Sequence, residues 1–155
     1  MKAIVLSHRF GKQVIEASVL NEVIAAVNGC PHDPKRGNTA SVRNHILDAL
    51  SRQGWTKELE LDRQSAITIT SIKQRVGLCL QTGNMSRMYA DLLKLQAIYL
   101  RGVIDSAIML LPTSEAAKRF GSNVANQERL LRELAIFERV ITVPMAIIGI
   151  DRGDK

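Results

Sequence analysis

Two continuous apolar runs in the second half of the chain constrain its fold more than any other feature. One is VIDSAIMLLP at residues 103–112, and the other is VPMAIIGI at residues 143–150. A strand with water on one face alternates apolar and polar side chains, whereas these runs are apolar at almost every position. They therefore predict central strands of a sheet that is covered on both faces.

Segments with helical periodicity can provide that cover. The longest is MSRMYADLLKLQAIYLRG at residues 85–102, where Met88, Leu92, Leu95 and Tyr99 form one apolar stripe. Thr113 is a suitable N-cap for a short helix that follows the first apolar run. The same reading predicts helices over residues 11–29, 40–55, 113–121 and 126–140.

Short alternating segments predict further strands before the long helix. KAIVLSH at residues 2–8 is either a first strand or the lead-in to the helix after it. A strand is predicted at residues 57–64, followed by a hairpin over residues 66–82 with a turn at Lys73–Gln74. We expect an α/β fold, in which a mixed β-sheet is flanked by helices on both faces, and a single domain over residues 1–155.

Composition narrows the class of partner. The net charge is +6, from 21 Lys and Arg against 15 Asp and Glu, and such a balance favours polyanions such as nucleic acid. No apolar run approaches the ~20 residues that a membrane helix requires, and the N-terminus does not resemble a signal peptide, so a cytoplasmic location is expected. The two cysteines, Cys30 and Cys79, predict neither a disulfide framework nor a metal cluster.

The hairpin is the segment best suited to chemistry, because the usual phosphate-loop, dinucleotide and nucleophile-elbow signatures are absent. Thr68 and Thr70 share one face of its first strand, and Gly77, Cys79 and Gln81 share one face of the second. A metal-dependent phosphodiesterase could use such a face if carboxylates on the two strands held Mg²⁺.

The segment RVGLCLQTGN, the helix with DLLKLQ, the ID…PT strand, GSNVAN and the closing ITVPMAIIGID together resemble one enzyme family. This family is the BglII/BamHI-like branch of the type II restriction endonucleases, which have the PD-(D/E)xK nuclease fold. The resemblance covers residues 42–151. It implies a restriction-endonuclease-like core, double-stranded DNA as the partner, Mg²⁺ as the cofactor of active members, and a homodimer or a heteromeric nuclease complex.

The family pattern has an Asp on the first hairpin strand and, about nine residues later, a Glu in the motif E-x-Q. Gln81 matches the glutamine, whereas the glutamate position is Cys79 and the aspartate position is Thr70 or Ser71. Both metal-binding carboxylates are thus replaced, and a thiol is a poor ligand for Mg²⁺. Glu60 and Asp62, on the preceding strand, are the nearest candidates for relocated ligands. The remaining predicted site residue is Asn44, on the helix before the hairpin.

The sequence is compatible with three functions. The first is a DNA-binding protein of this fold with degenerate or lost Mg²⁺-dependent cleavage. The second is an active endonuclease with a rearranged site that uses Asp62, Glu60, Gln81 and Lys73, with Mg²⁺ as cofactor. The third is a protein-interaction module without a DNA role. The predicted DNA contacts are Lys73, Arg75, Asn84, Arg87, Lys94, Ser122 and Asn123.

Overall fold

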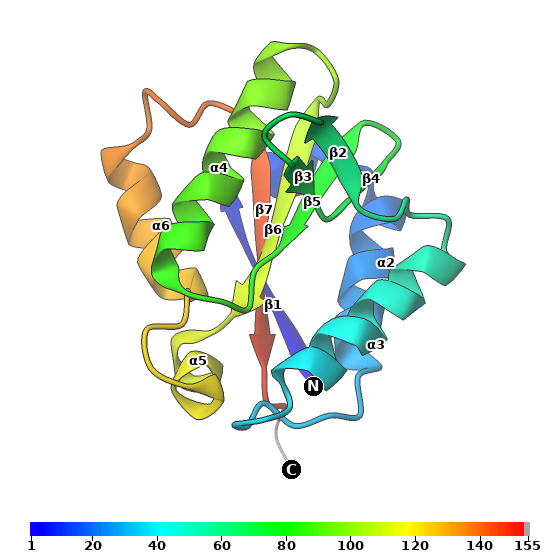
Figure 1. The fold of residues 1–155 in the computed structure, drawn as a ribbon, viewed down its shortest axis with the longest axis vertical. Coiled ribbons are helices and arrows are strands. Elements are labelled where there is room, and N and C mark those ends of the chain that lie inside the picture. Colours follow the sequence, from blue (N-terminus) through cyan, green and yellow to red (C-terminus); the bar gives the residue numbers. More distant parts are fainter. Residues whose placement is uncertain (154–155) are drawn as a thin grey trace.

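The computed structural model describes residues 1–153 and places both apolar runs in the middle of one sheet (Figure 1). They form β6 (Ser106–Pro112) and β7 (Met145–Asp151), and all residues of β6 and all but the last of β7 are buried. The prediction of two covered central strands is therefore confirmed. The predicted domain extends to residue 155, and residues 154–155 lie outside the described part of the chain.

The other elements precede β6 or lie between the two central strands. In chain order they are β1 (Lys2–His8), α1 (Gly11–Val14), α2 (Ala17–Asn28), α3 (Thr39–Arg52), β2 (Leu59–Asp62), β3 (Ile67–Ile69), β4 (Ser71–Lys73), β5 (Val76–Leu80), α4 (Met85–Leu100), α5 (Ser114–Phe120) and α6 (Gln127–Ile136).

The main sheet is mixed, with strand order β1-β7-β6-β5-β4. The three inner strands β5, β6 and β7 are parallel, and each edge strand is antiparallel to its neighbour. Strands β2 and β3 form a separate two-stranded sheet. Together with helices on both faces, this arrangement confirms the predicted fold class (Figure 1).

Alternate side chains of the central strands enter two hydrophobic cores. Ile108 and Leu110 of β6 pack with α2 and α3, whereas Met109 and Leu111 of the same strand pack with α4 and α6. Each face therefore buries its own layer of helices, which explains why these strands lack the polar alternation of a half-exposed strand. On β5, the same alternation sends Cys79 into the core beneath α4.

The structure corrects the predicted boundaries at two places. The helix expected over residues 11–29 is two helices, because the backbone at Ile15 and Glu16 is extended. The hairpin turn is at Gln74–Arg75, where both residues have positive φ, instead of at Lys73–Gln74. Moreover, the expected first hairpin strand is divided between β3 and β4, which belong to different sheets and meet at Thr70.

Candidate functional site

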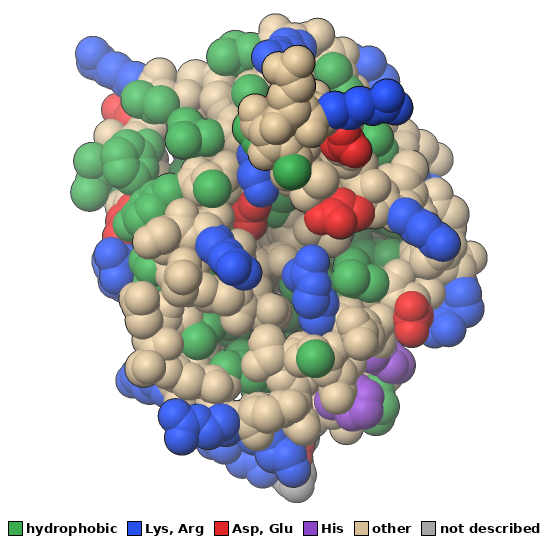
Figure 2. All heavy atoms as spheres, in the orientation of Figure 1, with side chains coloured by type: hydrophobic (Ala, Val, Ile, Leu, Met, Phe, Trp, Pro, Cys, Tyr) green, Lys and Arg blue, Asp and Glu red, His purple; other side chains and the backbone are tan. Residues whose placement is uncertain are grey.

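A polar cleft of about 750 Å³ opens beside the end of β5. Figure 2 shows a hollow on this face, with both basic and acidic side chains around it. The cleft lies between α3, the β2–β3 sheet, the turn after β5 and α4. Its lining residues are Thr39, Arg43, Glu58, Ala66, Thr68, Ile69, Thr70, Leu80, Gln81, Thr82, Gly83, Arg87, Ala90, Asp91 and Lys94.

Helix α4 contributes three charged residues to this cleft. Asn84 caps the helix, because its side chain accepts a hydrogen bond from the backbone N–H of Arg87. Arg87, Asp91 and Lys94 then follow at intervals of four and three residues, which places them on one side of the helix. The apolar stripe of α4, which includes Met88, Leu92 and Leu95, is buried in the core. The helical period therefore directs this charged row into the cleft.

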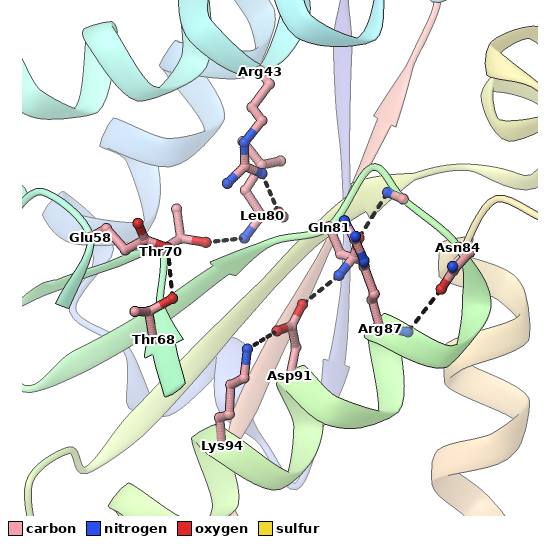
Figure 3. A network of polar contacts seen from close by, with 11 residues as sticks. Arg43, Glu58, Thr68, Thr70, Leu80, Gln81, Asn84, Arg87, Asp91 and Lys94 are labelled. Atoms are coloured by element: carbon pink, nitrogen blue, oxygen red, sulfur yellow. Dashed lines mark hydrogen bonds and ion pairs between the residues drawn. The ribbon is translucent and has the colours of Figure 1, made fainter. Parts of the chain in front are cut away.

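A chain of hydrogen bonds joins α4 to the end of β5 (Figure 3). The side chain of Gln81 donates to a carboxylate oxygen of Asp91 at 2.6 Å and accepts from the backbone N–H of Gly83 at 2.8 Å. The other carboxylate oxygen of Asp91 accepts from Lys94 at 3.1 Å. Gln81 and Asp91 are both buried. Gln81 therefore shapes the turn after β5 and pairs with a buried acid.

The opposite wall of the cleft carries hydroxyl groups and one carboxylate. Thr68 donates to Glu58 at 2.6 Å, and the Thr70 hydroxyl accepts from the backbone N–H of Leu80 at 3.0 Å. Arg43 reaches from α3 to the backbone carbonyl of Leu80, to which it donates at 2.6 Å. The last residue of β5 is thus held on both sides by residues of the cleft (Figure 3).

Cys79 does not lie in the cleft, and the prediction of a polar face at this residue is wrong. Its side chain is 1% exposed and packs with Ile69, Leu92 and other residues of the core beneath α4. Burial, followed by the negative charge of Asp91, raises the pKa of the Cys79 thiol to about 12. The thiol is therefore neutral at physiological pH and cannot act as a thiolate ligand or nucleophile.

The candidate relocated carboxylates also lie outside the cleft lining. Glu60 and Asp62 are exposed on β2, as predicted for its solvent face. Glu60 pairs with Arg63 at 3.8 Å, and Asp62 accepts a hydrogen bond from the backbone N–H of Ser65 at 2.7 Å. This bond from Ser65 lowers the pKa of the Asp62 carboxyl. The carboxylates that do line the cleft are Glu58 and Asp91.

Two of the predicted DNA contacts, Lys73 and Arg75, form ion pairs away from the cleft lining. Lys73 binds the carboxylate of Glu22 at 2.7 Å, and Arg75 binds that of Asp105 at 2.7 Å. A contact between either basic side chain and DNA would therefore compete with its carboxylate partner.

Four other predicted site residues, described below, also lie outside the cleft lining. Asn44 is exposed on α3, outside the lining, and Ser71 donates to the backbone carbonyl of Thr56. Ser122 and Asn123 are exposed in the segment whose next residue, Val124, forms a bridge with Asn84 beside the cleft. Of the predicted site residues, Thr70, Gln81, Arg87 and Lys94 are brought together in the cleft lining.

Sequence reasoning missed Arg43, Glu58 and Asp91 as site residues. A signal for Asp91 was present, because it adjoins the apolar stripe of its helix and an acid at such a position requires a partner. Arg43 and Glu58 had no comparable signal. Each is a charged residue in a polar segment, and only the packing of α3 and the β2–β3 sheet brings them to the cleft.

The sheet order and flanking helices define a restriction-endonuclease-like fold. The family model for "Restriction endonuclease BglII/BglIII" matches residues 3–150, and the chain therefore belongs to this family, as the sequence motifs predict.

Two solved structures share the fold. One is BglII complexed with a DNA 16-mer, with a TM-score of 0.84, 13% identity, and coverage of 97% of this chain and 76% of that chain. The other is free BglII, with a TM-score of 0.78, 12% identity, and coverage of 100% and 82%. A comparison with curated proteins finds no match. In residues 1–153 no helix is both long and apolar enough to span a membrane.

The donor atoms of the cleft do not suit Mg²⁺ in this arrangement. Magnesium requires a near-octahedral set of oxygen ligands, with one or two carboxylates among them. Both carboxylate oxygens of Asp91 accept hydrogen bonds from protein side chains, and Glu58 accepts one from Thr68. Within residues 1–153, no group of three His, Cys, Asp or Glu side chains could hold a metal ion. The lining presents three basic side chains, two carboxylates, and hydroxyl and amide groups, so its net charge favours an anionic ligand.

Proposed function

We propose that this chain is a cytoplasmic, DNA-binding member of the BglII/BglIII restriction endonuclease family in which Mg²⁺-dependent cleavage is degenerate or lost. The observation that carries the proposal is the position of Cys79. By the family resemblance, position 79 corresponds to the glutamate of E-x-Q. Its thiol is buried and neutral, and it faces the core instead of the cleft. Loss of this glutamate would remove a metal ligand but would leave the fold and the basic cleft in place.

The basic residues of the cleft support the DNA-binding half of the proposal. Arg43, Arg87 and Lys94 line the same opening, together with two carboxylates. The solved relative with a TM-score of 0.84 is in complex with a DNA 16-mer. A duplex bound at this cleft would make contacts to phosphate that weaken steeply with added salt.

Two assays on the purified full chain test this function. Gel shift with mixed-sequence duplex DNA across a salt series should give binding that falls as salt rises. Incubation of plasmid DNA with Mg²⁺ or Mn²⁺ should give no cleavage beyond that of a mock preparation. Absence of binding at every salt concentration would favour the third function, a protein-interaction module without a DNA role.

An active endonuclease with a rearranged site is the second candidate, because Glu58 and Asp91 both line the cleft. Under this alternative, a metal would displace the hydrogen bonds of Thr68 and Lys94 from these carboxylates. Cleavage that disappears in Asp91→Asn but persists in Asp62→Asn would establish it and would refute the proposal of lost activity. Asp62→Asn is a matched control, because Asp62 is exposed and lies outside the cleft lining.

We also propose that the chain forms a homodimer through an apolar patch on α4 and the segment that starts with α6. The patch comprises Leu93, Leu100, Ile136, Phe137 and Val140, which are between 36% and 76% exposed. Part of it lines a hollow of about 230 Å³ without polar lining. Figure 2 shows hydrophobic side chains gathered on this side of the molecule. An exposed apolar patch of this kind favours a protein contact.

Sedimentation velocity on matched variants tests the dimer. Val140→Asp should convert a dimer to a monomer, because it places a charge within the patch. Val14→Asp is the control, since Val14 is 52% exposed on α1 and lies outside the patch. A wild-type chain that sediments as a monomer at every concentration tested would refute the homodimer.

A further inference from the structure

Two arginines of the cleft have no acidic partner among residues 1–153. Lys94 is neutralised by Asp91 at 3.1 Å, whereas the side chains of Arg43 and Arg87 form no ion pair in this part of the chain. The lining as a whole has three basic and two acidic side chains. Its positive charge is therefore concentrated at Arg43 and Arg87.

Arg43 is fixed in position before any ligand arrives. Its Nη1 donates to the backbone carbonyl of Leu80 at 2.6 Å, and its side chain is half-buried against the end of β5. One guanidinium carries five N–H donors, so this bond leaves the others for a ligand. A guanidinium held in advance loses less conformational freedom when it binds an anion.

Arg87 reaches the same strand end from α4. A Cβ added at Gly83 would lie 3.5 Å from Cδ of Arg87 and 2.9 Å from the side-chain oxygen of Gln81. The absence of a side chain at Gly83 thus leaves room beside the Arg87 guanidinium. Figure 3 shows Arg43 and Arg87 reaching from different helices toward residues Leu80 and Gln81.

We propose that Arg43 and Arg87 form a phosphate clamp that holds backbone phosphates of DNA by direct guanidinium contact, without a divalent cation between protein and phosphate. The inference rests on the proposed DNA-binding function and specifies how the cleft performs it. A guanidinium matches phosphate geometry through two parallel N–H bonds, which a single ammonium cannot reproduce. The charged clamp thereby supplies the attraction to phosphate that a bound metal would supply.

Fluorescence anisotropy with a labelled mixed-sequence duplex tests the clamp. Affinity is measured over a KCl series in EDTA and again in MgCl₂ at matched ionic strength. The variants are Arg43→Gln, Arg87→Gln and the double variant. Arg52→Gln, at the end of the same helix as Arg43, and Arg101→Gln, at the end of α4, are controls because both residues lie outside the cleft lining.

The wild-type chain should bind equally well in EDTA and in MgCl₂. Each clamp variant should bind about tenfold more weakly, and each should lower the slope of log affinity against log salt by about one. The double variant should lower that slope by about two, whereas each control should leave it unchanged. Arg43→Lys should recover only part of the affinity, because it restores the charge without the planar fork.

Three results would overturn the clamp. Binding that requires MgCl₂ would contradict direct contact, while the proposed DNA-binding function would stand. Clamp variants that bind like the wild type, or that lose thermal stability while keeping the wild-type salt slope, would assign these arginines a structural role. A wild-type chain that binds no DNA in either buffer would overturn the proposed function and the clamp together.

Discussion

Replacing Cys79 with glutamate introduces the carboxylate that the family resemblance predicts at this position, and it tests whether position 79 faces the core or the cleft. Burial raises the pKa of the native thiol from 9.0 to about 12, with the charge of Asp91 as the second cause. At 1.36 kcal/mol for each pKa unit, these surroundings disfavour a negative charge by about 4 kcal/mol. The introduced glutamate side chain should therefore cost a similar amount of folding free energy when it is ionised.

Cys79→Gln is the matched control, because its side chain has nearly the size of glutamate without the charge. Both variants overfill a site that is 1% exposed, so both are expected to lose stability from steric crowding. The difference between them isolates the charge. Urea denaturation at pH 8 should give Cys79→Glu an unfolding free energy about 4 kcal/mol below that of Cys79→Gln.

The pH dependence gives an independent check on this difference. The introduced carboxyl has a pKa near 4.3 in the unfolded chain, and burial raises its pKa in the folded chain. Between those values the folded state binds more protons than the unfolded state, so stability falls as pH rises. The two variants should therefore be nearly equal below pH ~4 and should diverge as pH rises above the pKa of the unfolded chain.

A Cys79→Glu variant as stable as Cys79→Gln at pH 8 would refute the burial argument. Stabilisation of this variant by Mg²⁺, absent in the Gln control, would show that position 79 opens to the cleft and can complete a metal site. That outcome would also remove the observation on which the proposal of lost cleavage rests.

Three further substitutions probe the site and the scaffold by thermal and urea denaturation. Asp91→Ala removes a buried carboxylate from its two partners and should lower the unfolding free energy by about 2–4 kcal/mol, whereas an unchanged value would mean that the network is solvent-screened. Gly11→Ala places a Cβ within the backbone of Met145 and should cost about 3 kcal/mol or more, and a wild-type melting temperature would contradict that close approach. Asn84→Ala removes the cap at the backbone N–H of Arg87 and should cost about 1 kcal/mol, which Asn84→Asp should largely restore.

The central part of the fold follows from local patterns in the sequence. The runs around β6 and β7 are apolar because both faces of these strands are covered, and this requirement is visible in each run by itself. The stripe of α4 and the cap at Thr113 are equally local, since each depends on residues within a few positions. The family motifs were recognisable for the same reason.

The division of residues 11–29 into two helices was not predictable in this way. Ile15 interrupts a good helical pattern because its side chain is buried in the core, while Gly11 lies against the backbone of Met145. The approach of Gly11 to Met145 involves a β-strand more than one hundred residues away in the chain. Long-range packing of this kind overrides local helix propensity.

The sequence by itself determined that Cys79 stands two residues before Gln81, where the family resemblance predicts a glutamate, and that the chain carries a net positive charge. Only the tertiary structure decided which groups face one another. It placed Cys79 in the core, paired Gln81 with Asp91, and brought Arg43 to the end of β5. The physical reason is that side-chain identity is a local property, whereas burial and charge pairing depend on elements that meet only after the chain has folded.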